Sequence, residues 1–163
     1  MSGWWEAKLR RTRAYLRARV EPGEREAAAA LLSPAELGLF DGMHVADRRH
    51  GLDVLRHLEG RGVVDRDLLV AGLLHDCGKG RRVRLVHRVA WSLGQRYGAW
   101  IWRVASVMPT FPAGLAAMRD HAARSARLAE AAGSSPRVVE LIRNQEAPTD
   151  QDGRLLLEAD EAN

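Results

Sequence analysis

His75 and Asp76 are the strongest candidates for chemistry in this sequence, because the pair closes a run of apolar residues, 68–74. Taking an imidazole and a carboxylate out of water without partners costs several kcal/mol. We therefore expect both side chains to be hydrogen-bonded, paired with other charges or bound to a metal. A His-Asp doublet is common by chance, so taken alone it indicates only a satisfied pair in the protein core.

Two more distant residues turn this pair into a predicted metal site. His50 lies 25 residues before His75, on a predicted helix that a short connection makes an antiparallel neighbour of the apolar run. Asp160 ends another apolar helical stretch close to the C-terminus. Two imidazoles and two carboxylates suit a divalent first-row metal ion, with water completing the coordination sphere. The predicted ligands are His50, His75, Asp76 and Asp160 for one divalent ion, with Mn, Fe, Zn, Mg, Co and Ni not distinguished.

The elements that must position these residues are predicted to be helices. Residues 33–36, Ser-Pro-Ala-Glu, supply an N-cap serine, a first-turn proline and a glutamate at the third helical position. A helix is expected over 47–58, ending at the glycines that follow it, and the next is expected to begin near Asp65. Residues 68–74 are apolar on every face, which is typical of a helix buried at the centre of a bundle. The sequence therefore predicts an all-α fold.

The N-terminal region carries an apolar stripe on a helix that is otherwise crowded with arginines. The stripe recurs at spacings of three and four residues, through Trp5, Leu9, Thr12, Leu16 and Val20. We expect residues 1–39 to form an N-terminal helical extension packed on residues 40–163. A chain of 163 residues suffices for one sizeable core, so one structural domain is expected overall.

The composition limits the setting in which the protein is expected to work. Cys77 is the single cysteine, which excludes an intrachain disulfide, and no stretch resembles a signal peptide or a transmembrane segment. We therefore expect a cytoplasmic protein. The net charge of +4 raises the question of an anionic partner, and the Arg-rich N-terminal helix could contact nucleic acid or a membrane surface. Charge runs on helices are usually solvated faces, however, and that interpretation is favoured.

At the residues quoted above, the chain resembles the HD superfamily of metal-dependent phosphohydrolases, from about residue 40 to residue 163. The segment 73–79, Leu-Leu-His-Asp-Cys-Gly-Lys, is similar to the most recognisable motif of that family. His50 and Asp160 match its flanking ligands in type, order and approximate spacing. The resemblance implies an HD-domain-like helical bundle that holds a metal ion.

Departures from the family narrow the expected activity. Gly78-Lys79 stands where relatives that hydrolyse guanosine tetraphosphate carry Glu-Asp, and the His-Asp-x-Gly-Lys form is closer to phosphodiesterase-type relatives. His121 resembles one of the additional histidines of those relatives, but Gln145 stands where a two-metal enzyme would offer another. An amide oxygen is a poorer ligand than imidazole, so one metal ion is expected.

The expected function is hydrolysis of a small phosphoester, a nucleotide or cyclic nucleotide, by metal-activated water. Asp76 would orient the water, and Lys79 would meet the negative charge on the phosphoryl oxygens. Only two of the 25 basic residues are lysines, which makes Lys79 conspicuous. His121 is either a ligand or general acid at the site or a capped surface histidine.

Two alternatives stay open. The first is a non-catalytic HD module that senses a ligand or partner through its metal-bearing pocket. The second is an oxygenase with paired iron, which Gln145 disfavours because that chemistry needs a second metal ion.

Two further groups of residues lie between the halves of the motif. The tryptophans Trp91, Trp100 and Trp102 could stack on a nucleobase, but core packing is the favoured interpretation because aromatic side chains mainly bury area. His87, in an Arg-rich segment, is expected on the surface.

Overall fold

The structure of this chain is a computed structural model that describes residues 6, 12–13, 15–80, 83, 85–109 and 111–163. The regular elements of this part of the chain are all helices, so the predicted all-α class is confirmed. Their bounds are α2 (Pro22–Leu31), α3 (Pro34–Gly42), α4 (Val45–Gly60), α5 (Arg66–Leu74), the 3-10 turn η1 (Cys77–Lys79), α6 (Leu85–Tyr97), α7 (Trp100–Ala105), α8 (Phe111–Arg119), α9 (His121–Ala131), α10 (Pro136–Arg143) and α11 (Gln151–Ala162). Among the described residues, no helix is long and apolar enough to cross a membrane.

The caps of these helices follow from local sequence. The Ser33 hydroxyl accepts from the Glu36 amide, and the Glu36 carboxylate accepts from the Ser33 amide, which forms the predicted capping box of α3. Asp65 caps α5 by accepting from the Leu68 amide. Helix α4 ends at Gly60, and Gly62 follows with a φ of 81°, a conformation that glycine adopts without strain.

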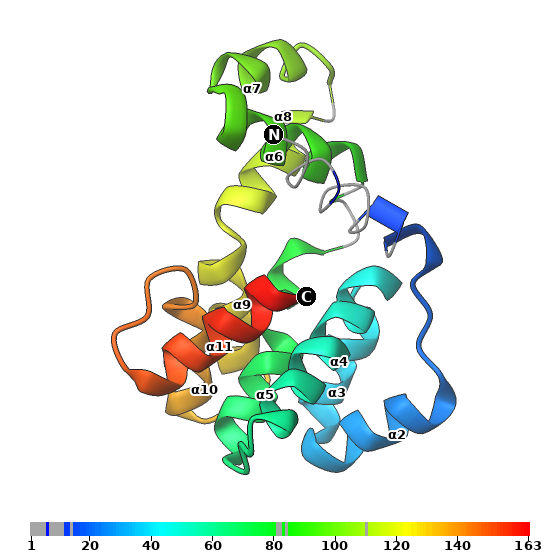
Figure 1. Cartoon of the computed structure of the whole chain (residues 1–163), viewed down its shortest axis with the longest axis vertical. Helices are drawn as coiled ribbons and strands as arrows, with labels where there is room; N and C mark the ends of the chain where they lie inside the picture. The colour runs from blue at the N-terminus through cyan, green and yellow to red at the C-terminus, as the bar shows by residue number, and fades with distance from the viewer. Residues whose placement is uncertain (1–5, 7–11, 14, 81–82, 84, 110) are drawn as a thin grey trace.

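Helix α5 is the centre of the bundle (Figure 1). Every residue from Leu68 to Leu74 is buried, as predicted, and α4, α10 and α11 pack around the helix. The main core cluster also takes in Ala28 from α2 and Phe40 from α3. Polar residues at the C-terminal end of α5 are therefore surrounded by other helices.

Helices α4 and α5 cross closely because glycines lie at the crossing. A Cβ atom at Gly51 would lie 2.8 Å from the backbone oxygen of Leu73, and one at Gly72 would meet the side chains of Leu58 and Val54 at 3.0 and 3.2 Å. Gly51 directly follows His50, and Leu73 is two residues before His75. This close approach therefore brings the two predicted histidine ligands together.

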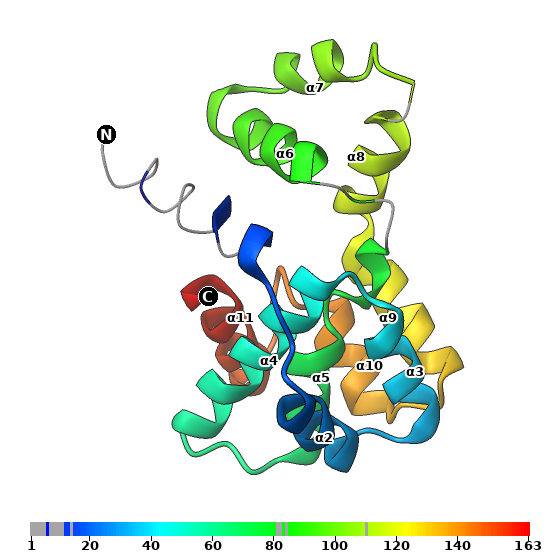
Figure 2. The same ribbon diagram turned by 90° about the vertical axis from the view of Figure 1, so that its right-hand side faces the viewer.

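Helices α6, α7 and α8 form an arm that extends from the bundle, with α7 at its outer end (Figure 2). A small core of Ala90, Phe111 and Leu115, with Trp91 and Trp102 packed against it, holds the arm together. The two tryptophan rings are stacked, with 4.8 Å between centroids. Packing of Trp91 and Trp102 agrees with the favoured interpretation of the aromatic segment, whereas that interpretation is wrong for Trp100, which is 60% exposed.

The expectation that His87 lies on the surface is wrong. Its side chain is buried in the arm, where its ring lies 4.7 Å from that of Phe111 and closely approaches Gly114. The absence of a Cβ at Gly114 leaves room for this ring, and the sequence does not indicate that contact because it forms between different helices.

The predicted N-terminal extension lies partly outside the described residues. Residues 12–13 and 15–17 are helical and carry Thr12 and Leu16 of the predicted apolar stripe, whereas Trp5 and Leu9 lie outside the described residues. Val20 follows the helical residues and is not itself helical. Residues 39 and 40, on either side of the predicted boundary, both lie within α3. The division into residues 1–39 and 40–163 stays a prediction.

We expect Gly51→Ala to lower the free energy of unfolding by about 1–3 kcal/mol, because the new methyl group would force α4 away from the Leu73 backbone. Gly38→Ala is the matched control: it lies within α3 with nothing near its Cβ position, so the higher helix propensity of alanine should stabilise by up to about 1 kcal/mol. Urea unfolding of both variants measures the difference. A Gly51→Ala variant as stable as the Gly38→Ala variant would contradict the close crossing.

Candidate metal centre

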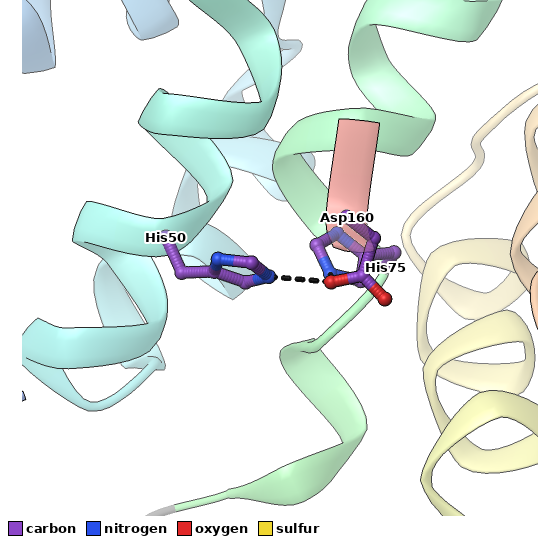
Figure 3. Close-up of side chains that lie close together, drawn as sticks. All are labelled: His50, His75 and Asp160. Atoms are coloured by element: carbon purple, nitrogen blue, oxygen red, sulfur yellow. Dashed lines mark hydrogen bonds and ion pairs between the residues drawn. The ribbon is translucent and has the colours of Figure 1, made fainter. Parts of the chain in front are cut away.

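Three side chains from separate parts of the chain converge beside the C-terminal end of α5 (Figure 3). His50 lies in the second turn of α4, His75 follows α5, and Asp160 lies in the last turn of α11. His50 Nε2 is 2.7 Å from Asp160 Oδ1, and His75 Nε2 is 3.6 Å from the same oxygen. One ligand atom of each residue lies within 4.8 Å of those of the other two, so the group could hold a metal ion.

The His75 ring is oriented for this role by a bond within its own helix. Nδ1 lies 2.9 Å from the Gly72 carbonyl oxygen, which can only accept a hydrogen bond, so Nδ1 is the donor. In the neutral ring, Nε2 then carries the lone pair. Nε2 is buried and has no hydrogen-bond partner within the described chain. A buried imidazole nitrogen left in this state, with its other nitrogen fixed by a carbonyl, is typical of a metal ligand.

The backbone of His75 is also fixed. The buried Gln145 side chain donates from Nε2 to the His75 carbonyl oxygen at 3.2 Å. The resemblance to the HD superfamily implied a histidine at this position in two-metal enzymes. In this structure the Gln145 amide instead holds the backbone of His75, which supplies an imidazole to the cluster.

The charges of the cluster are strongly coupled. Burial lowers the pKa of His75, but the carboxylates of Asp76 and Asp160 act more strongly and raise it to about 9. Burial raises the pKa of Asp160, whereas the hydrogen bond with His50 and charge interactions with His50 and His75 hold it far below its usual value. At neutral pH and without a metal ion, the cluster therefore holds a proton on His75 beside ionised carboxylates. A divalent ion would replace this proton as the neutralising positive charge.

Asp76, Lys79 and His121 form a second group beside the first. Lys79 Nζ lies 2.5 Å from Asp76 Oδ2, and His121 Nε2 lies 3.6 Å from Asp76 Oδ1. His121 Nδ1 donates to the Met118 carbonyl at 2.7 Å, which turns Nε2 toward the carboxylate. Burial raises the pKa of Asp76, but Lys79 and the neighbouring imidazoles outweigh this effect and keep the pKa below its ordinary value. The buried carboxylate is therefore ionised.

Of the four predicted ligands, the structure brings His50, His75 and Asp160 into one group. Asp76 Oδ2 lies 3.7 Å from His75 Nε2, but the Asp76 carboxylate is paired with Lys79 and is not a member of that group. Its role as a fourth ligand stays a prediction. The predicted catalytic residues Lys79 and His121 both lie next to Asp76.

A cavity of about 420 Å³ adjoins both groups. Its volume lies within the roughly 300–1,000 Å³ that small-molecule sites occupy. The predicted residues His50, Asp76, Lys79 and Asp160 all line it. The arm and the N-terminal region contribute Thr12, Tyr15, Leu85, Arg88, Trp91, Ser92 and Gln95.

The sequence interpretation missed two arginines that line this cavity, Arg49 and Arg88. Arg49 bonds carboxylates on α2 and on its own helix. Arg88 bonds both oxygens of the buried Asp47, at 2.6 and 2.8 Å, and this joins the arm to α4. Asp47, three residues before His50, could have indicated a nearby arginine, because a buried carboxylate needs a cation to pair with it. The sequence does not indicate which of the 25 basic residues supplies it.

Comparisons of the chain with protein-family models, with curated proteins and with solved structures gave no match.

We expect the protein to bind about one equivalent of a divalent transition metal. His75→Ala and His50→Ala should each weaken that binding by more than the roughly 10- to 100-fold that loss of an outer hydrogen-bond partner costs, because each removes a donor atom. His57→Ala is the control, since it removes an imidazole two turns along the same helix from His50 and outside the group. Competition with a chelating dye measures the affinities. Equal affinities for the wild type and the His50→Ala and His75→Ala variants would rule out this assignment.

Proposed function

We propose that this protein is a metal-dependent phosphohydrolase that acts on a small phosphoester, with nucleotides and cyclic nucleotides as the first candidates. The observation that carries the proposal is that two members of the His50, His75 and Asp160 group, His50 and Asp160, line a cavity, so the group is not enclosed on all sides. A structural metal site is closed by protein ligands, whereas a catalytic site leaves a position for water or substrate. The resemblance of the sequence to HD-superfamily hydrolases supports the same function.

The proposed mechanism assigns a separate task to each group. A divalent ion held by His50, His75 and Asp160 would lower the pKa of a bound water and polarise a phosphoryl oxygen. Asp76 is ionised and buried beside His75, and in this proposal it orients the attacking water by accepting its hydrogen bond.

Lys79 and His121 act on the substrate in this proposal. Lys79 lines the cavity and carries a compact positive charge that would meet the oxygens of the phosphoryl group as negative charge spreads over them. His121 Nε2, which faces Asp76, would give a proton to the leaving oxygen.

Among the described residues, the rest of the cavity lining has more cations than acids, because Asp53 is its one acidic residue. Arg49 and Arg88 line the cavity, and both guanidinium groups are held by carboxylates. Trp91 and Gln95 also line the cavity; both lie on α6, the arm helix that forms one side of it. Cations fixed in place recognise phosphate with little loss of side-chain entropy.

A phosphoester panel assayed with Mn, Mg, Zn, Fe, Co and Ni tests the proposal. On the best substrate, Lys79→Ala should lower kcat/KM by about 100-fold or more while retaining metal, because it removes one charge contact to the transition state. Lys79→Arg should recover part of the activity, because the planar guanidinium places its donors differently. Arg61→Ala is the control, since this exposed arginine pairs with Glu158 outside the cavity.

The outcome separates an enzyme from a binding module. Full activity of Lys79→Ala would remove Lys79 from the mechanism. Saturable binding of a phosphorylated ligand without turnover under any of the metals would instead favour the non-catalytic sensing module.

A further inference from the structure

The outer end of the arm exposes large hydrophobic side chains to solvent. In the described part of the chain, most of the exposed large hydrophobic residues lie between residues 97 and 108. They are Tyr97, Trp100, Val104, Val107 and Met108, which we call the arm tip. Val107 is 83% exposed. Figure 2 shows that α7, at the centre of this segment, is the part of the arm furthest from the bundle.

Helix α7 is apolar on both of its faces. Trp102 and Ala105 pack inward on the core of the arm, and Trp102 Nε1 donates to the Ala90 carbonyl at 3.2 Å. Trp100 and Val104, four residues apart, share the opposite face and are exposed. A surface helix normally presents polar residues on that face. The outer face of α7 is therefore apolar, which is typical of a surface that binds a partner.

The charge of this region has one sign only. The sequence from Cys77 to Arg119 contains no aspartate or glutamate and eight basic residues. Of the chain's 25 basic residues, 17 therefore lie elsewhere, together with all 21 of its acidic residues. Two of the eight, Arg96 and Arg103, are exposed beside the arm tip. A partner that covers the arm tip should therefore bury its apolar side chains in an apolar interior and present negative charge to Arg96 and Arg103.

We propose that the arm tip docks on the surface of an anionic lipid bilayer. Tryptophan and tyrosine settle at the level of the lipid headgroups, and valine and methionine gain by entering the acyl boundary. Arginines beside them are attracted to the negative surface potential of the leaflet.

Other partners fit the arm tip less well. A nucleic acid would use the arginines and the exposed rings, but it offers nothing for Val104, Val107 and Met108 to bury against. A second copy of the same face would bring like charges together.

Co-sedimentation of the full chain with vesicles tests the proposal. We expect binding to phosphatidylcholine vesicles that contain phosphatidylglycerol, weaker binding to phosphatidylcholine alone, and weakening by salt. The double variant Val104→Asp/Val107→Asp should reduce partitioning by about tenfold or more, because it removes the inserting side chains and adds repelled charges.

Val64→Asp is the matched control. Val64 is 90% exposed, and the connection between α4 and α5 that carries it lies at the opposite end of the molecule from α7 (Figure 2). Both substitutions are at exposed sites and should leave the melting temperature unchanged, so lost binding would not reflect unfolding. Equal binding by both variants, or no binding to anionic vesicles, would overturn the proposal. Vesicle binding that Arg96→Gln/Arg103→Gln leaves unchanged would also overturn it. A dimer or a single-stranded nucleic acid complex that the wild type forms and only the Val104→Asp/Val107→Asp variant loses would overturn it too.

Discussion

His75 and Asp76 bury an imidazole and a carboxylate beside the C-terminal end of the most buried helix. Each needs a compensating group, and α5 does not supply them all. Asp160 comes from the end of the chain, His121 from the start of α9, and Lys79 from the turn that follows the pair. The packing of α11 against α5 and of α9 against η1 is therefore tied to the neutralisation of one buried cluster of charge.

Much of this fold could be predicted from the sequence because its signals are local. Capping residues such as Ser33 and Asp65 bond amides three residues away, and the apolar run that ends at Leu74 indicates burial without any knowledge of the neighbouring helices. The types and order of His50, His75 and Asp160, read with Asp76 and the resemblance to the HD superfamily, nominated a metal site because imidazoles and carboxylates suit a divalent first-row ion.

What could not be predicted depends on contacts between distant segments. His87 is buried because Gly114, on another helix, leaves space for its ring. Arg88 lines the cavity because Asp47 is buried 41 residues earlier in the chain. The pairing of Asp76 with Lys79 is local, but whether the carboxylate faces the lysine or a metal ion depends on distances that residue types do not specify. Periodicity predicts which face of a helix is apolar, and it leaves open what lies against that face.

The ion pair of Asp47 and Arg88 has a consequence for related sequences. Loss of the arginine alone would leave a buried carboxylate uncompensated, at a cost of about 3–5 kcal/mol, whereas exchange of both residues for a well-packed apolar pair is close to neutral. A sequence that keeps both residues or replaces both would therefore be stable, whereas one that keeps only the aspartate would be destabilised. Positions 47 and 88 should vary together among descendants of a common ancestor, and their joint presence would mark the lineages in which the arm is fastened to the helix that carries His50.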